Sequence, residues 1–199
     1  MKQSSHKAFE LVSIVLTGAA LVTGLYLLLL AAAPWLPSTP ILGTQTIDVT
    51  AKLSGTTPGE RGNRLYIPQI GIDVAIEEGT DISVLDKGAW HRQPHNGNPE
   101  EGGNFVVSAH RFSMGWTPQQ TRVKSPFYQI DKLRAGDEFF VDWNNARYAY
   151  RVVRTYDVPK TAIQIEGPSK DAKLTLYSCD LRGESAGRVV VEAVPLGKV

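Results

Sequence analysis

The chain has 199 residues, of which 42% are hydrophobic, and its formal net charge is +1. This length is enough for one globular domain of ordinary size beside a membrane segment. The chain has 21 basic and 20 acidic residues, and without Lys2, Lys7 and Glu10 the rest of the chain has equal numbers of basic and acidic residues. Because phosphate binding needs a basic surface, this balance argues against nucleic acid as the main partner.

The first predicted element is a transmembrane helix. No charged residue occurs from Leu11 to Ala33, and at 1.5 Å per residue this run spans a hydrocarbon core of about 30 Å. Lys2 and Lys7 precede it, so residues 1–10 are expected in the cytoplasm and the body outside, anchored to the cell membrane by a single pass. The alternative is a cleaved signal peptide, although its apolar region is usually only about 7–15 residues long. Either interpretation exports the body of the protein.

The rest of the chain divides into a stalk and a folded domain. Residues 34–62 are rich in Pro, Thr, Ser and Gly, which predicts an extracellular stalk, and residues 63–199 form the domain. In the domain, spacing predicts one or two helical turns between Ser125 and Asp137. Many short strands favour an all-β fold, a closed and mostly antiparallel barrel of seven or eight strands. These strands are expected near Arg64–Ile67, Val74–Ile76, Phe105–Ala109, Glu138–Val141, Ala149–Tyr156, Leu174–Ser178 and Arg188–Val194.

The chain contains a single cysteine, Cys179. Exported domains usually pair their cysteines or do without them, so Cys179 is either a buried small hydrophobe or a reactive thiol. Alternation of polar and apolar residues places it at the end of one strand and Arg188 at the start of the next. If the two strands form a hairpin, both residues meet at one rim of the sheet, where a cation favours the reactive thiolate.

Histidines are the candidate proton carriers. His110 directly follows a predicted strand, a position from which a side chain reaches the rim of a sheet. His91 lies closer to the body of the fold, whereas His95 is in a turn-rich loop. The spacing of His91, His110 and Cys179 matches no compact zinc-ligand motif, so no metal site is expected.

These residues carry a resemblance to the sortases, the membrane-anchored cysteine transpeptidases of the bacterial cell surface. The run TLYSC at residues 175–179 resembles their nucleophile motif TLxTC, and AHR at residues 109–111 resembles their Gly-His-Arg. Arg188 stands where many members have an arginine at the head of the last strand. The resemblance extends from about Leu65 to Val194. Ser178 replaces the usual threonine but keeps a hydroxyl group.

The resemblance implies a sortase-like barrel with His110, Cys179 and Arg188 as catalytic residues. It implies a thioester acyl-enzyme on Cys179, formed with an LPXTG-like sorting signal of an exported protein. The acceptor would be an amine of a cell-wall precursor or a pilin lysine. No cofactor is implied, and calcium dependence is left open. The stalk lacks the Asp-Pro-aromatic lid sequence of pilus-building members, which favours protein anchoring.

Further residues are candidates for the substrate site, each with an alternative. His91, Ser178 and Thr175 are expected near bound substrate, although a structural role for His91 is an equal alternative. Arg182 competes with Arg188, but it lies in a loop where most charges are simply solvated.

The sequence is also compatible with two other functions. One is another exported cysteine enzyme resembling an L,D-transpeptidase, although the sequence LYSCD lacks the glycine of their Ser-x-Gly-Cys pattern. The other is a non-catalytic wall-binding module in which Cys179 is a buried filler.

Overall fold

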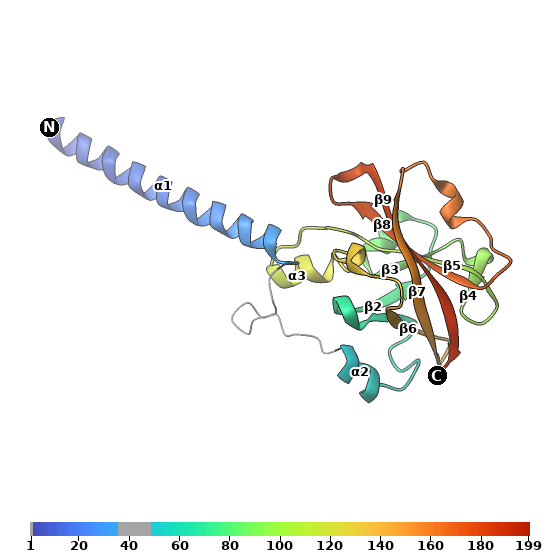
Figure 1. Ribbon diagram of the computed structural model, residues 1–199. Coiled ribbons are helices and arrows are strands. Elements are labelled where there is room, and N and C mark those ends of the chain that lie inside the picture. Colours follow the sequence, from blue (N-terminus) through green and yellow to red (C-terminus); the bar gives the residue numbers. More distant parts are fainter. Residues whose placement is uncertain (1, 36–48) are drawn as a thin grey trace.

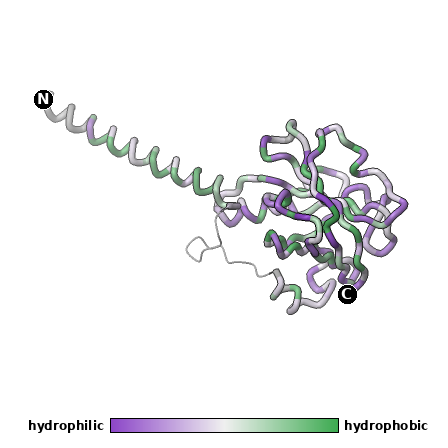
Figure 2. Tube along the Cα trace, in the orientation of Figure 1, coloured by the Kyte–Doolittle hydropathy of each residue, from purple (hydrophilic) through white to green (hydrophobic). Residues whose placement is uncertain are grey.

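The computed structural model describes residues 2–35 and 49–199. One long helix, α1 (Lys2–Ala32), projects from a β-barrel domain (Figure 1). Its stretch Phe9–Ala32 has a mean hydropathy of 2.3, and almost none of it is buried inside the protein; it is largely green or white in Figure 2. Within the described part of the chain, α1 is the one helix long and apolar enough to cross a membrane, at the place the sequence predicts.

Part of the predicted stalk, residues 34–62, packs on the domain. Residues 36–48 lie outside the described residues. A short helix, α2 (Val49–Gly55), then places Leu53 against the outside of the barrel. Arg147 Nη1 donates a hydrogen bond to the Leu53 carbonyl oxygen at 2.7 Å. The end of the stalk sequence is therefore attached to the domain.

The domain is one nine-stranded sheet that closes on itself. The strand order is β3-β2-β1-β6-β7-β9-β8-β5-β4, and β3 also pairs with β5. This pairing closes eight strands into a barrel, and β4 is an addition at the edge of β5. The strands are β1 (Arg64–Ile67), β2 (Ile72–Glu77), β3 (Ala89–Arg92), β4 (Gly97–Asn98), β5 (Gly102–Ser108), β6 (Glu138–Trp143), β7 (Ala146–Val158), β8 (Lys173–Asp180) and β9 (Gly183–Lys198). The predicted closed barrel is confirmed.

The remaining elements are short helices in the connections between strands. They are η2 (Pro68–Ile70), η3 (Ile82–Asp86), η4 (Pro94–Asn96), α3 (Pro118–Val123), η5 (Ile130–Lys132) and η6 (Ile163–Glu166). Most strand pairs are antiparallel, as predicted, but β2–β3 and β5–β8 are parallel. The sequence does not predict β3 and β4. β3 has the sequence AWHR, whose first three residues are all buried, so it shows no alternation of polar and apolar residues, and β4 has only two residues.

The barrel core follows the alternation of the last hairpin. Leu174 and Leu176 of β8 point inward and meet Val189 and Val191 of β9 in the same buried cluster. The intervening residues therefore face outward, and Cys179 belongs to this second set. The predicted helical segment closes part of the core, because its residues Phe127, Ile130 and Leu133 are fully buried.

Candidate active site

Three residues singled out in the sequence lie at one rim of the barrel. In the β8–β9 pair, Cys179 is opposite Arg188. In the parallel β5–β8 pair, Ser108 is opposite Tyr177. Because both strands of a parallel pair advance together, His110, two residues after Ser108, is level with Cys179. The order β9-β8-β5 thus places the arginine, the cysteine and the histidine side by side.

A hydroxyl group of the nucleophile motif holds the strand ends in this register. The Ser178 Oγ donates to the Ala109 carbonyl oxygen at 2.6 Å, and the Ala109 N–H donates to the Tyr177 carbonyl oxygen at 3.4 Å. Both bonds join Ala109, the residue before His110, to β8: one to Ser178 directly before Cys179, and the other to Tyr177, two residues before it. Ser178 is almost fully buried, so the structure gives it a positioning role. A serine can replace threonine here because only the hydroxyl group makes the bond.

Thr175 makes a similar cross-strand contact near the start of β8. Its Oγ1 donates to Asn104 Oδ1 at 2.7 Å, and both residues are fully buried. Asn104 Nδ2 donates in turn to the carbonyl oxygens of Ile165 and Gly167, at 3.0 and 2.7 Å. Thr175 therefore helps to hold the connection between β7 and β8 against the barrel.

The His110 ring is partly exposed and faces a carboxylate. Its side chain is 31% exposed, and its Nε2 lies 3.8 Å from Asp86 Oδ1 at the end of η3. The His110 carbonyl oxygen accepts the Phe127 N–H at 3.1 Å, which fixes the backbone at this point. No motif in the sequence points to Asp86, because it reaches the rim from a separate connection between β2 and β3.

The two candidate arginines have different environments. Arg182 donates through Nε and Nη2 to both oxygens of Asp180, at 3.0 and 2.9 Å, and its side chain is 78% exposed. Hydrogen bonds from the side chain and the backbone N–H of Arg182 lower the pKa of Asp180 to about 2. Arg188 is half-buried on β9, opposite Cys179. The geometry therefore favours Arg188 as the cation of the site.

A glycine permits the close strand approach beside Arg188. Gly187 has a φ of 139°, and a Cβ at this position would lie 2.6 Å from the Val158 carbonyl oxygen. Arg188 itself pairs with Val158 across the β7–β9 ladder. Only a residue without a side chain allows β9 to pass this close to β7 at the point where the two strands begin to pair.

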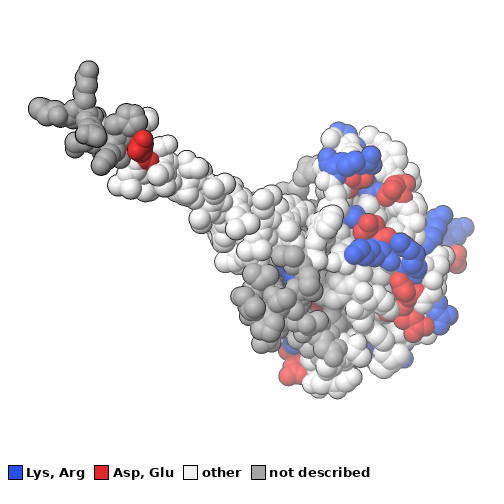
Figure 3. Space-filling model, turned by 60° about the vertical axis from the view of Figure 1, so that its left-hand side comes forward, with Lys and Arg blue, Asp and Glu red and all other residues white. Residues whose placement is uncertain are grey.

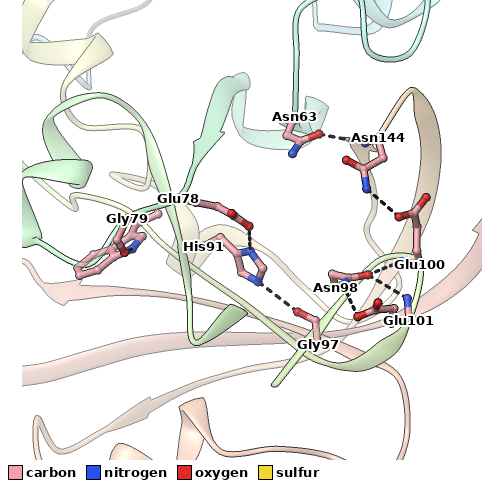
Figure 4. A network of polar contacts seen from close by, with 10 residues as sticks. Asn63, Glu78, Gly79, His91, Gly97, Asn98, Glu100, Glu101 and Asn144 are labelled. Atoms are coloured by element: carbon pink, nitrogen blue, oxygen red, sulfur yellow. Dashed lines mark hydrogen bonds and ion pairs between the residues drawn. The ribbon is translucent and has the colours of Figure 1, made fainter. Parts of the chain in front are cut away.

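His91 is enclosed in the wall of the barrel, away from solvent. Its side chain is 1% exposed, with Nδ1 2.9 Å from Glu78 Oε1 and Nε2 3.1 Å from the Gly97 carbonyl oxygen (Figure 4). The ring also packs edge-on against Phe105 and Trp143. With both nitrogens engaged and no exposed edge, this environment favours the structural alternative over a contact with substrate.

A carboxylate that the sequence did not single out anchors the β7–β8 connection. Glu166, at the end of η6, accepts hydrogen bonds from Arg92 at 3.0 and 3.2 Å, from Gln93 at 3.1 Å and from the Tyr177 hydroxyl. Burial alone would raise the pKa of Glu166, but these hydrogen bonds outweigh it and lower the pKa. Tyr177 shares its face of β8 with Cys179, so the anchor acts two residues away from the cysteine.

The partners of Glu166 are far apart in the sequence. Arg92 lies 74 residues before Glu166, and no local motif connects the two. Glu166 can be identified as an anchor only from its contacts in the folded structure, so the sequence does not predict it.

The described residues offer no metal centre. Within residues 2–35 and 49–199, no group of three or more His, Cys, Asp or Glu side chains is arranged to hold a metal ion. The chemistry available at the rim is that of a thiol between an imidazole and a guanidinium group, the set used for nucleophilic acyl transfer.

Comparison with known proteins identifies the family. The family model for the sortase domain matches residues 65–196, well over half of the chain. The chain belongs to the sortase family. The matched range agrees closely with the extent of the resemblance in the sequence, about Leu65 to Val194.

Individual relatives of this sortase are distant. It is 29% identical to Sortase D of Bacillus subtilis over 102 residues, which are 51% of this chain and 45% of that protein. The chain spans about half the length of the curated relatives it matches. The solved structure of sortase E from Streptomyces avermitilis is 25% identical, covers 69% of this chain and 88% of its own, and superposes with a TM-score of 0.57. A sortase D5 structure from Clostridium perfringens, 22% identical with a TM-score of 0.56, covers 75% and 87% of the two chains and shares the fold.

Proposed function

We propose that this sortase is a cysteine transpeptidase of the cell surface. It cleaves an LPXTG-like sorting signal at the C-terminus of exported proteins and transfers the protein to an amine, such as that of a cell-wall precursor or a pilin lysine. The observation that carries the proposal is the pairing of Cys179 with Arg188 at the rim that also holds His110.

The first step is formation of a thioester. The Cys179 thiolate attacks the carbonyl carbon of the scissile peptide bond, and a C–S bond forms. As the tetrahedral intermediate collapses, the C–N bond breaks and protonated His110 gives its proton to the leaving amine. Arg188 suits the role of oxyanion donor or substrate clamp, because its guanidinium carries fixed N–H donors and is always charged.

The second step reverses these roles with a new amine. Neutral His110 takes a proton from the incoming amine, whose nitrogen attacks the thioester carbonyl carbon. A C–N bond forms, the C–S bond breaks and Cys179 leaves as a thiolate. All groups in this scheme are side chains of the protein itself, so no cofactor is needed.

The exposure of Cys179 supports this role over that of a buried filler. The cysteine is partly accessible rather than enclosed, and it adjoins a cation. Buried structural cysteines are inert, whereas reactive ones sit in partly exposed, electropositive surroundings.

The proposed location is the cell membrane, with the catalytic domain outside. Lys2 and Lys7 precede the apolar stretch of α1, and the first charge after it is Asp48. The positive-inside rule then places the N-terminus in the cytoplasm. A membrane tether suits the reaction, because exported substrates emerge through the same membrane.

A ligation assay tests the proposal. The full chain in detergent micelles is incubated with a library of LPXTG-like peptides and a soluble oligoglycine amine, and products are read by mass spectrometry. We expect a ligated peptide with the wild type and with Arg182→Ala, and none with Cys179→Ala or His110→Ala. Ligation by Cys179→Ala would exclude a mechanism through a cysteine thioester, because the chain has no other thiol.

A further inference from the structure

The loop that follows His110 lies against the outer end of α1. This loop, residues 111–124, includes α3, which contacts α1 (Figure 1). The Tyr26 hydroxyl donates to the Trp116 carbonyl oxygen at 2.6 Å, and Arg122 Nη2 donates to the Ala33 carbonyl oxygen at 2.9 Å. We refer to residues 111–124 as the post-histidine loop.

The contact with Tyr26 sets the depth of the loop relative to a membrane. Tyr26 lies inside the apolar stretch Phe9–Ala32, six residues before its end, or about 9 Å along the axis at 1.5 Å per residue. The 24-residue stretch is about 36 Å long, compared with a hydrocarbon core of about 30 Å. If the excess is shared between the two ends, about 3 Å extends beyond the hydrocarbon core on each side, and Tyr26 lies about 6 Å inside its boundary. The Trp116 backbone that Tyr26 contacts then lies at, or just below, the boundary between acyl chains and headgroups.

The surface of the post-histidine loop suits that boundary. Residues 112–121 contain no charged residue. Trp116 is 85% exposed, and Phe112, Met114 and Val123 are also exposed. Tryptophan is enriched at membrane interfaces, where one part of its ring is in apolar surroundings and its N–H remains hydrated. On the face shown in Figure 3, the blue and red side chains of the domain lie mostly on the side away from α1.

The backbone polar groups at the tip of the loop are hydrogen-bonded within the protein, as an apolar environment requires. The Gly115 N–H donates to Thr121 Oγ1 at 2.9 Å, and the Trp116 N–H donates to Gln120 Oε1 at 2.9 Å. Thr117 Oγ1 accepts the Gln120 N–H at 3.1 Å and caps α3. Together with the bond from Tyr26, these contacts satisfy polar groups that would otherwise require water.

We propose that the post-histidine loop is a membrane-docking surface whose side chains Phe112, Met114 and Trp116 enter the outer interface of the bilayer that α1 crosses. The inference rests on the membrane topology proposed above. Docking at this loop ties the backbone beside His110 to the membrane surface. The active-site rim then stays close to substrates that are attached to, or emerging from, the same bilayer.

Depth-dependent quenching tests this proposal without any catalysis. In a Cys179→Ala background, single cysteines are introduced by Trp116→Cys, Leu21→Cys or Ile163→Cys and labelled with an environment-sensitive fluorophore. Each full-length variant is placed in phosphatidylcholine nanodiscs with or without bromine on the acyl chains. Leu21 lies inside the apolar stretch. Ile163 is the matched control, because it is 82% exposed on η6, away from α1 in Figure 1.

We expect emission at shorter wavelength, and quenching by brominated lipid, at positions 21 and 116 but not at 163. Quenching at 21 with water-like emission at 116 would overturn the docking proposal while leaving the membrane anchor intact. Equal quenching at 116 and 163 would also overturn it, because contact would then be unspecific. If position 21 is not quenched, the proposed topology itself fails and the docking proposal fails with it.

Discussion

Replacing Glu166 by glutamine should destabilise the domain by about 2 kcal/mol. The carboxylate is 17% exposed and accepts four hydrogen bonds, two of them from the fork of Arg92. A hydrogen bond to a charged group contributes about 1.5–3 kcal/mol and a neutral one about 0.5–1.5 kcal/mol. Glutamine keeps part of the set as neutral bonds, and Arg92, at 27% exposed, recovers some hydration. About 2 kcal/mol corresponds to a Tm lower by roughly 4–8 °C for a domain of this size.

The same substitution should also make the Tm of the domain fall less steeply as the pH is lowered. Because the pKa of folded Glu166 lies below its usual value of 4.5, its contribution is complete above that value. The contribution is lost as the pH falls through the lower, folded pKa. In the Glu166→Gln variant this loss is absent, so the difference in Tm from the wild type should narrow below about pH 4.5.

Thermal unfolding of the full chain in detergent, followed by circular dichroism between pH 7 and pH 3, measures both effects. Glu138→Gln is the matched control, because Glu138 forms an ion pair with Arg151 in which both side chains are about half exposed. Such an exposed pair contributes about 0.2–1 kcal/mol. Equal Tm losses for Glu166→Gln and Glu138→Gln, or a Tm difference that does not narrow in acid, would refute the reasoning.

Three further changes separate catalytic from structural roles. Arg188→Lys keeps the charge but loses the planar set of N–H donors, so kcat/KM in the ligation assay should fall by a factor of about 10²–10³. Arg182→Ala should keep a kcat/KM close to that of the wild type, because the Arg182 side chain is exposed and paired with Asp180. Ser178→Ala should lower the free energy of unfolding by about 1–2 kcal/mol and reduce the ligation activity, because the hydrogen bond to Ala109 is lost. Ser178→Thr should keep the wild-type stability and activity. Chemical denaturation measures the stability, and the ligation assay measures the activity. His91→Ala should lower the Tm with little change in KM for the peptide, because the ring is enclosed in the barrel wall. A large rise in KM with an unchanged Tm would instead show that His91 contacts the substrate.

The sequence predicts those parts of the fold that depend on local pattern. β1 occupies the predicted range, and the last hairpin forms because alternating residues of β8 and β9 place one face of each strand in the core. The helical turns near η5 follow from apolar residues at spacing three. By contrast, β3 buries three consecutive residues and shows no alternation, and α2 has only seven residues, too few to show a helical period. Contacts with the rest of the domain hold both elements in place.

The candidate site divides in a similar way. Cys179 and His110 are recognisable from positions near the ends of β8 and β5, and Arg188 from its place before an apolar run. Arg188 is predicted at the start of its strand, but β9 already begins at Gly183. The pairing of neighbouring strands brings the three residues together. Asp86 and Glu166 are not recognisable, because each acts through a partner distant in the sequence. A residue whose role depends on a contact between two connections leaves no pattern in either of them.

Trapping the acyl-enzyme tests the central claim most directly. The full chain is incubated with an LPXTG-like peptide in the absence of any added amine, quenched in acid and digested, and the fragment containing Cys179 is examined by mass spectrometry. We predict that this fragment gains the mass of the N-terminal part of the peptide, and that hydroxylamine removes it, as expected for a thioester. His110→Ala should give little of this species and Arg182→Ala as much as the wild type. Peptide cleavage or transfer without an acyl mass on Cys179, or with the acyl mass on another residue, would contradict the mechanism.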